Sequence, residues 1–284
     1  MTRQLAVLAV TILFAVPAFA EEPVPIESLR EDFLSWKFGM FIHFNVATFH
    51  NRQGGNGYED PATFKPDKLD CNQWAETAVS AGMKYAVLTV KHSGGWCLWD
   101  SKLTKTHAMS AFTNYKNGKG DIAREFVDAC RKHGLKVGFY YCLPFGREGP
   151  NWRNCLPPEA KDDPVSFIKK QLTELLTNYG QIDILWFDQN QVNLRDHWQD
   201  IKKHVKSIQP NCIVIANNSH DFKDTDIHGY EYPLLKQRKN PNMLPPADNK
   251  NPAEVCDKFG RRWFWMPRLR ADWRIKSAQD VVGM

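Results

Sequence analysis

The chain has 284 residues, of which 43% are hydrophobic and 24% charged, with 17 glycines and 17 prolines, and this balance excludes a disordered or fibrous protein. Its 37 Lys and Arg outnumber its 32 Asp and Glu only slightly, which gives no reason to expect a nucleic-acid partner. The seven cysteines include no CxxC pair, so a zinc site is disfavoured, and buried free thiols are a simpler interpretation than disulfides.

The N-terminus has the pattern of a secretory signal. Arg3 precedes an apolar run over residues 5–16, and Ala18-Phe19-Ala20 follows as a small-x-small cleavage site. The alternative is a membrane anchor, but a span needs about 20 apolar residues. No later stretch is apolar enough either. We therefore expect a signal peptide over residues 1–20 that is cut after Ala20, a secreted or periplasmic protein, and no membrane span.

Short apolar runs and helical patterns alternate along the rest of the chain. We expect seven strands, at residues 38–44, 85–90, 137–142, 184–188, 212–216, 226–231 and 262–266, the last two being the weakest. Helical periodicity lies between several of them, around residues 74–82, 122–134, 164–180 and 198–208, and the first three patterns stop at a glycine. Asp163-Pro164 is typical of a capped helix start.

This alternation predicts a parallel α/β fold. A (β/α)8 barrel of the TIM type needs about 250 residues, which is close to the length of residues 21–284. An open doubly wound sheet is the alternative. Because about seven strands are recognisable, we expect one barrel domain over residues 21–284 that is incomplete.

Polar side chains stand where most of the predicted strands end, which is where the active site of such a barrel lies. They are His43, Lys91-His92, Tyr140-Tyr141, Asp188, Asn217-Asn218 and Glu231. The chain has no GxGxxG, GxxxxGK[ST], GxSxG or HExxH motif, so nucleotide-dependent chemistry loses support. A metal hydrolase that uses the two histidines and Asp188 is a weaker alternative, because no HxH pair accompanies them.

The carboxylates Asp188 and Glu231 suit glycoside hydrolysis. That reaction needs one carboxylate at the anomeric centre and one carboxylic acid that protonates the leaving oxygen. Aromatic residues near the predicted strand ends, such as Trp186 and Tyr141, would suit the apolar face of a sugar, although most of the ten tryptophans are better explained as core.

Four longer segments carry a family resemblance. They are residues 36–44 (WKFGMFIHF), 82–101 (GMKYAVLTVKHSGGWCLWDS), 134–141 (GLKVGFYY) and 184–188 (ILWFD). They resemble the FGIFIHWG, AGAKYxVLTxKHHDGFxLWDS, GLYYS and LWFDG blocks of the α-L-fucosidases of glycoside hydrolase family 29, in the same order.

The resemblance implies a barrel enzyme without a cofactor, a retaining exo-hydrolase that removes terminal α-L-fucose from glycans or glycoconjugates. By position, Asp188 would be the nucleophile and Glu231 the general acid/base, with Glu254 as the second choice for the acid/base. The residues implied to line the fucose pocket are His43, His92, Tyr141 and Trp186.

The chain also departs from the family pattern. Ser93 and Gly94 replace the second histidine and the aspartate of KHHDG, and Asn217-Asn218-Ser219 stands where many members have an arginine. The family's last strand and its common C-terminal β-sandwich have no counterpart here, so we expect a barrel without its eighth strand, closed in one alternative by a homo-oligomer. A catalytically weak or inactive carbohydrate-binding relative is the alternative function.

Overall fold

The computed structural model describes residues 22–144, 155–188, 194–231, 245–266 and 275–277. The expected signal peptide, residues 1–20, lies outside them. Among the described residues, no helix is long and apolar enough to cross a membrane.

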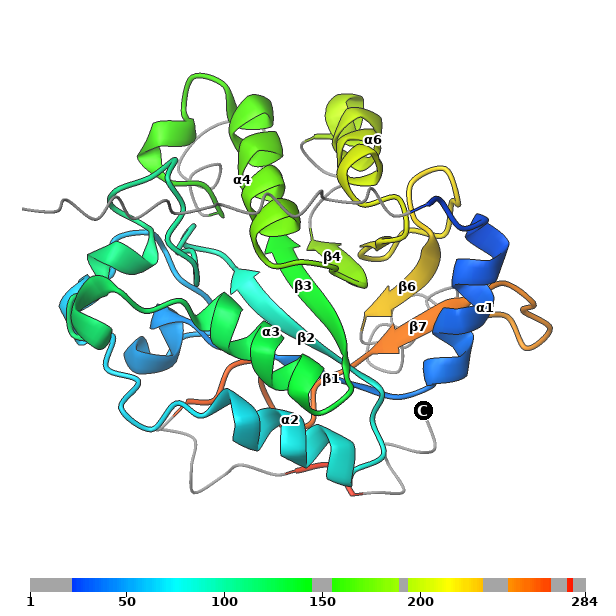
Figure 1. Cartoon of the computed structure of the whole chain (residues 1–284), viewed down its shortest axis with the longest axis horizontal. Helices are drawn as coiled ribbons and strands as arrows, with labels where there is room; N and C mark the ends of the chain where they lie inside the picture. The colour runs from blue at the N-terminus through cyan, green and yellow to red at the C-terminus, as the bar shows by residue number, and fades with distance from the viewer. Residues whose placement is uncertain (1–21, 145–154, 189–193, 232–244, 267–274, 278–284) are drawn as a thin grey trace, which may run out of the picture.

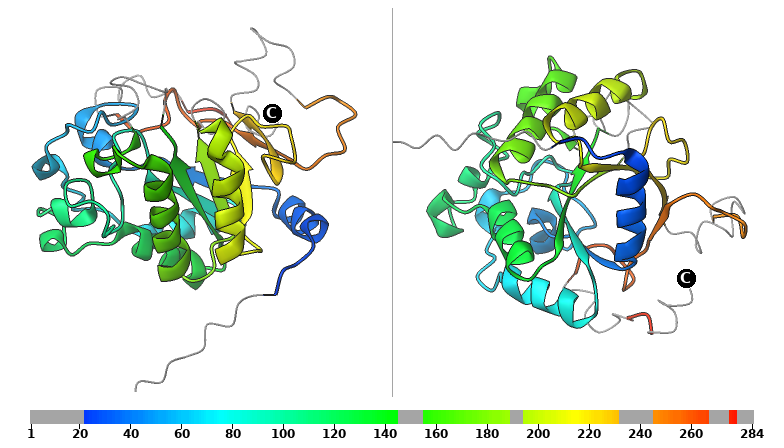
Figure 2. Two further views of the ribbon diagram at one scale, coloured as in Figure 1. Left: turned by 90° about the horizontal axis from the view of Figure 1, so that it is seen from above. Right: turned by 45° about the vertical axis from the view of Figure 1, so that its right-hand side comes forward.

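Seven parallel strands form one sheet in sequence order, as Figure 1 shows. They are β1 (Gly39–Ile42), β2 (Tyr85–Lys91), β3 (Lys136–Cys142), β4 (Ile184–Asp188), β5 (Ile213–Ala216), β6 (Ile227–Glu231) and β7 (Ala253–Cys256). The sheet curls into a partial barrel (Figure 2), and in the described part of the chain β1 and β7 are its edge strands. The expected incomplete (β/α)8-type barrel is therefore confirmed, and the open doubly wound sheet is not.

Four helices cover the convex side of the curled sheet (Figure 1): α2 (Cys71–Ser80), α3 (Ile122–Lys132), α4 (Pro164–Asn178) and α6 (Trp198–Ile208). An aspartate caps the start of the first three, because the Asp70, Asp121 and Asp163 side chains each accept a backbone N–H of the first turn. Beyond their ends, Gly82, Gly134 and Gly180 adopt a positive φ of 68–77°, which costs glycine little.

A further helix, α1 (Ile26–Trp36), closes one end of the curled sheet (Figure 2). Phe33 and Trp36 pack against Tyr85 at the start of β2, with ring centroids 5.9 Å apart in both pairs. The same cluster includes Ile184 and Ile227, the first residues of β4 and β6. We did not predict this helix. It covers the amino ends of the strands and leaves their carboxyl ends for a site.

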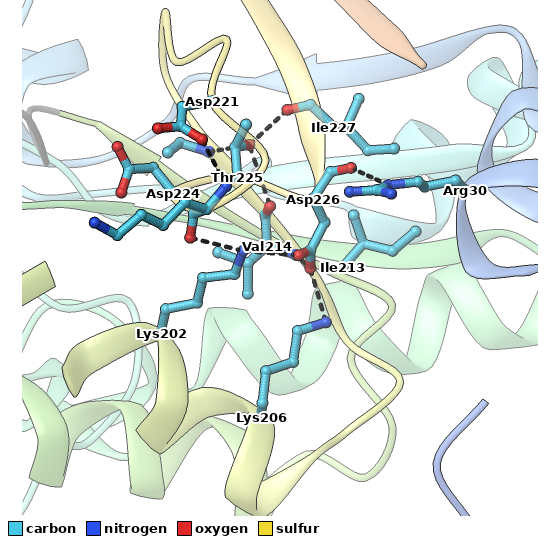
Figure 3. Close-up of polar contacts among 12 residues, drawn as sticks. Arg30, Lys202, Lys206, Ile213, Val214, Asp221, Asp224, Thr225, Asp226 and Ile227 are labelled. Carbon is cyan, nitrogen blue, oxygen red and sulfur yellow. Dashed lines mark hydrogen bonds and ion pairs between the residues drawn. The ribbon is translucent and has the colours of Figure 1, made fainter. Parts of the chain in front are cut away.

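Close to the amino end of β6, a buried aspartate joins α1, α6 and the sheet (Figure 3). The Asp226 carboxylate lies 2.9 Å from Lys202 Nζ and 2.7 Å from Lys206 Nζ, and its Oδ2 accepts the backbone N–H of Val214 at 2.8 Å. Its carbonyl oxygen accepts the side chain N–H of Arg30 at 2.9 Å. Burial would raise the pKa of Asp226, but the two lysines outweigh it and lower that pKa.

The prediction of a strand at residues 262–266 is wrong. Those residues form a bent segment, and β7 is Ala253–Cys256 instead. The bent segment brings aromatic side chains to the carboxyl ends of the strands, where the Phe264 N–H donates to the Gln53 side chain at 3.2 Å. The acidic Glu254 interrupts the apolar pattern of β7, so the sequence does not indicate a strand there.

Candidate active site

Two carboxylates meet at the carboxyl ends of β4 and β6. Asn217, directly after β5, has its side chain nitrogen Nδ2 2.8 Å from Asp188 Oδ1 and 2.8 Å from Glu231 Oε2. These two carboxylate oxygens therefore cannot be farther apart than twice that distance. The structure brings the two predicted catalytic residues together.

Tyr140 is the second donor to Asp188. Its hydroxyl donates to Asp188 Oδ2 at 2.8 Å, and its ring lies between two others, 5.2 Å from His92 and 5.5 Å from Trp186 by ring centroids. Burial raises the pKa of the Tyr140 hydroxyl well above its ordinary value, and the nearby Asp188 charge adds to this. The hydroxyl therefore keeps its proton and remains a donor to Asp188.

The two predicted pocket histidines contact each other. Their ring centroids are 5.6 Å apart, and His43 also stacks on Trp263 at 4.8 Å. Burial lowers the pKa of both, that of His92 to about 4 against a small opposing effect of Glu231. Both rings are therefore neutral at physiological pH. His92 Nδ1 lies 3.0 Å from the Ser93 hydroxyl, so its other ring nitrogen is the one that can exchange a hydrogen bond with a sugar hydroxyl.

Tyr141 is not part of this cluster. Successive side chains of a strand point to opposite faces, so Tyr140 faces the inside of the barrel and Tyr141 the helix layer. The Tyr141 hydroxyl donates to Gln171 Oε1 of α4 at 2.7 Å, and Lys91 Nζ lies 3.9 Å from its ring centroid. The pocket position that we expected for Tyr141 is occupied by Tyr140.

Glu254 lies deeper in the barrel than the two catalytic candidates. In the β6–β7 register it pairs with Gly229, whereas Glu231 pairs with Cys256. Its Oε1 accepts from the Tyr85 hydroxyl at 2.9 Å, and its Oε2 from Trp186 Nε1 at 2.8 Å. Burial raises its pKa. Both oxygens are thus engaged below the mouth, which favours Glu231 over Glu254 as the acid/base.

Trp186 forms part of the floor of the site. Only 3% of it is exposed, and its indole nitrogen is engaged with Glu254. It supports the Tyr140 ring from below. The structure therefore places Trp186 next to the pocket, beneath the residue that contacts Asp188.

Sequence reasoning missed several residues of the site. Trp263 stacks on His43, and Phe264 packs edge-on against both histidines, at 5.3 and 5.0 Å. Lys258, two residues after β7, interacts electrostatically with Glu231. The dense aromatic run at residues 263–265 was visible in the sequence, but we interpreted it as a strand.

A cavity of about 210 Å³ lies away from the carboxylates. Its lining includes Tyr58, His107, Pro157, Pro158 and Lys161, and none of the predicted site residues. The described residues contain no group of three or more His, Cys, Asp or Glu side chains arranged to hold a metal ion, so His43, His92 and Asp188 do not form one.

Known proteins similar to this chain share one description. The α-L-fucosidase family model matches residues 55–284. Alpha-L-fucosidase 1 of Arabidopsis thaliana is 29% identical over 267 residues, covering 85% of this chain and 50% of that protein. Plasma alpha-L-fucosidase of Rattus norvegicus is 28% identical, with 86% and 60% covered. This chain therefore spans about half the length of these relatives.

Solved structures are similar as well. Alpha-L-fucosidase isoenzyme 1 from Paenibacillus thiaminolyticus superimposes with a TM-score of 0.65 at 27% identity, covering 89% of this chain and 66% of that one. A glycoside hydrolase 29 family member from an unknown rumen bacterium gives a TM-score of 0.64 at 27% identity, with 86% and 48% covered.

Proposed function

The chain belongs to the α-L-fucosidase family, and from that premise we propose that it hydrolyses terminal α-L-fucosyl residues of glycans or glycoconjugates with retention of configuration. The observation that carries the proposal is the contact of Asp188 and Glu231 with one amide nitrogen, each at 2.8 Å. Retaining glycosidases hold their two carboxyl groups about 5–5.5 Å apart, and inverting ones hold them farther apart. The shared nitrogen is compatible with the retaining separation.

In the first step, an Asp188 oxygen would attack the anomeric carbon while Glu231 gives its proton to the glycosidic oxygen. The C1–O bond to the aglycone breaks, and a fucosyl ester of Asp188 forms. In the second step, Glu231 takes a proton from water as that water attacks C1. Fucose leaves, Asp188 is ionised again and Glu231 is protonated again.

The surrounding residues suit a small neutral sugar. The neutral rings of His43 and His92 can exchange hydrogen bonds with hydroxyls, and Trp263 offers an aromatic surface beside His43. Tyr140 keeps one Asp188 oxygen in place while the carboxylate attacks. Lys258 supplies positive charge near Glu231, although the arginine of the family pattern is absent from residues 217–219.

The test is release of 4-nitrophenol from 4-nitrophenyl α-L-fucoside by the folded chain, residues 21–284. We expect turnover that falls by about 10³-fold or more in Asp188→Ala, because the nucleophile is gone. Asp128→Asn changes an exposed aspartate of α3 and is the matched control, expected to keep full activity. NMR of the first sugar released should show the α-anomer.

A cooperative melt without turnover on any α-L-fucoside would contradict the proposal and support the alternative, a carbohydrate-binding relative. That protein would retain fucose affinity, measurable by calorimetry, and Asp188→Ala would leave the affinity nearly unchanged. The observation that supports this alternative is that Ser93 and Gly94 stand where the family pattern has a histidine and an aspartate.

Export is a separate proposal that rests on residues 1–20. The charged start, apolar run and Ala18-Phe19-Ala20 end support cleavage after Ala20. N-terminal sequencing of the protein from its host should begin at Glu21. A chain that begins at Met1 would contradict export by this route.

A further inference from the structure

Asn217 is held rigidly at the centre of the site. Its backbone N–H donates to the carbonyl oxygen of Phe187 at 2.8 Å, which continues the β4–β5 pairing one residue past the strand. The residue is only 6% exposed. An amide nitrogen carries two hydrogens, and here one is directed at Asp188 and the other at Glu231. Each carboxylate thus receives one hydrogen bond from the same group.

The orientation of this amide is fixed by charge. If it were reversed, its oxygen would face two carboxylates, and both hydrogen bonds would become repulsive contacts. In the orientation observed, Oδ1 is buried, and within the described part of the chain it has no hydrogen-bond partner. A buried unpartnered acceptor is unfavourable, so the two charge-assisted bonds of Nδ2 must outweigh that cost.

We propose that Asn217 is a positioning residue that sets the spacing of Asp188 and Glu231 and donates in turn to whichever of them carries the charge. The proposal rests on the proposed function. Before the first step, Asp188 is the ionised partner. Once the fucosyl ester forms, Asp188 is neutral and Glu231, having given up its proton, is ionised. A fixed amide with two donors can serve both halves of the reaction without moving.

Several other side chains would act differently at this position. Aspartate would add a third negative charge, and serine has only one proton to donate. A lysine would bring a positive charge against both carboxylates, whereas the amide donates to each without adding charge. The neighbouring Asn218 also contacts Glu231: its Oδ1 accepts the backbone N–H of Glu231 at 3.2 Å, and its Nδ2 donates to Glu231 Oε2 at 3.5 Å, a longer bond than that of Asn217.

The experiment compares the pH dependence of kcat/KM in the wild type, Asn217→Ala and Asn217→Asp, with an alkyl α-L-fucoside as substrate, because its departing oxygen needs the proton of Glu231. Asn217→Ala should lower kcat/KM about 10- to 100-fold, the effect of losing a hydrogen bond to a charged group. Both limbs of the profile should move to higher pH, because each ionised carboxylate loses a donor. Asn217→Asp should move them farther.

The matched control is Asn211→Ala. Asn211 is a buried asparagine before the same strand, β5, where it binds the backbone of Glu22 and Val24 at 2.9 and 2.8 Å, far from the carboxylates. It should lower the melting temperature and leave the pH profile in place. A folded Asn217→Ala with an unchanged profile and kcat/KM would overturn the inference.

The inference can be decided even if the wild type folds but shows no turnover, an outcome in which the proposed function fails. In that case the protonation of Asp188 and Glu231 is measured directly, by NMR titration of chain labelled with ¹³C at the Asp and Glu carboxyl carbons. Both titrations should move to higher pH in Asn217→Ala. If neither moves, Asn217 does not act on the two carboxylates.

Discussion

Asp188 receives hydrogen bonds on both carboxylate oxygens, from Tyr140 and from Asn217, each at 2.8 Å. These bonds hold both oxygens of the carboxylate in place, as attack on a bound substrate requires. Two side chains of the same cluster are neutral, because burial lowers the pKa of His92 and raises that of Tyr140. At the scale of the residue, the two donors to Asp188, a phenol hydroxyl and an amide, are themselves uncharged.

The role of Glu231 predicts a dependence on the leaving group. Glu231→Gln removes the proton that the departing oxygen needs, so hydrolysis of an alkyl α-L-fucoside should fall by about 10²- to 10⁴-fold. An activated aryl fucoside leaves without protonation and should lose much less in the first step. Steady-state kinetics on the two substrates checks this. Equal losses would assign Glu231 another role.

Tyr140 and Tyr141 provide a matched pair, because they are adjacent on β3 and differ in the face to which they point. Tyr140→Phe should lower kcat/KM about 10- to 100-fold, since Asp188 loses a charge-assisted hydrogen bond. Tyr141→Phe leaves the buried Gln171 without its donor, which should cost about 1–3 kcal/mol of unfolding free energy with little change in kcat. Kinetics and urea unfolding of both variants test the assignment, and the opposite pattern would refute it.

At the scale of the element, the aspartates that precede α2, α3 and α4 and the glycines that follow them define the helices, so these three were predictable from local chemistry. α1 was not, because it follows a proline with no side-chain cap and its role is to cover the ends of distant strands. β7 was not predicted either, because the acidic Glu254 interrupts its apolar pattern. Glu254 lies inside the barrel because Tyr85 and Trp186, which are distant in the sequence, donate hydrogen bonds to its carboxylate.

The ion cluster at Asp226 predicts the effect of one neutral substitution. Asp226→Asn leaves Lys202 and Lys206 without their buried partner and should cost about 3–5 kcal/mol of unfolding free energy at pH 7. The folded pKa of Asp226 is lowered, so its stabilisation is present above the unfolded value of about 4 and is lost as the pH falls through the lower folded value. Urea unfolding should show a smaller difference from wild type at pH 3.

At the scale of the whole molecule, one curled sheet connects every described strand. α1 covers the amino ends of the strands, and the aromatic segment after β7 contacts the histidines at the other end. The amino and carboxyl ends of the strands therefore differ in what covers them and in their role. The α1 end and the Asp226 cluster add to the stability that the core between sheet and helices provides, and the candidate site lies at the other end.

The buried histidines predict how the stability of the whole chain depends on pH. Their folded pKa values lie below the unfolded value of about 6.5, that of His92 at about 4. Between those values the unfolded chain binds more protons, so stability should fall as the pH drops from 6.5 towards 4. His92→Gln should flatten this slope in urea unfolding from pH 7 to pH 4.5, and an unchanged slope would contradict the burial of His92.

By itself the sequence determined the class of fold, most strands and helices, the two catalytic candidates and the family, because these depend on local periodicity, capping and contiguous motifs. Only the tertiary structure decided which side of β3 faces the mouth, that Glu254 lies below it, and that residues 262–266 form no strand and place Trp263 and Phe264 against the histidines. The central position of Asn217 also belongs to this second group, because Asp188, Asn217 and Glu231 come from three strands and meet only when the sheet curls.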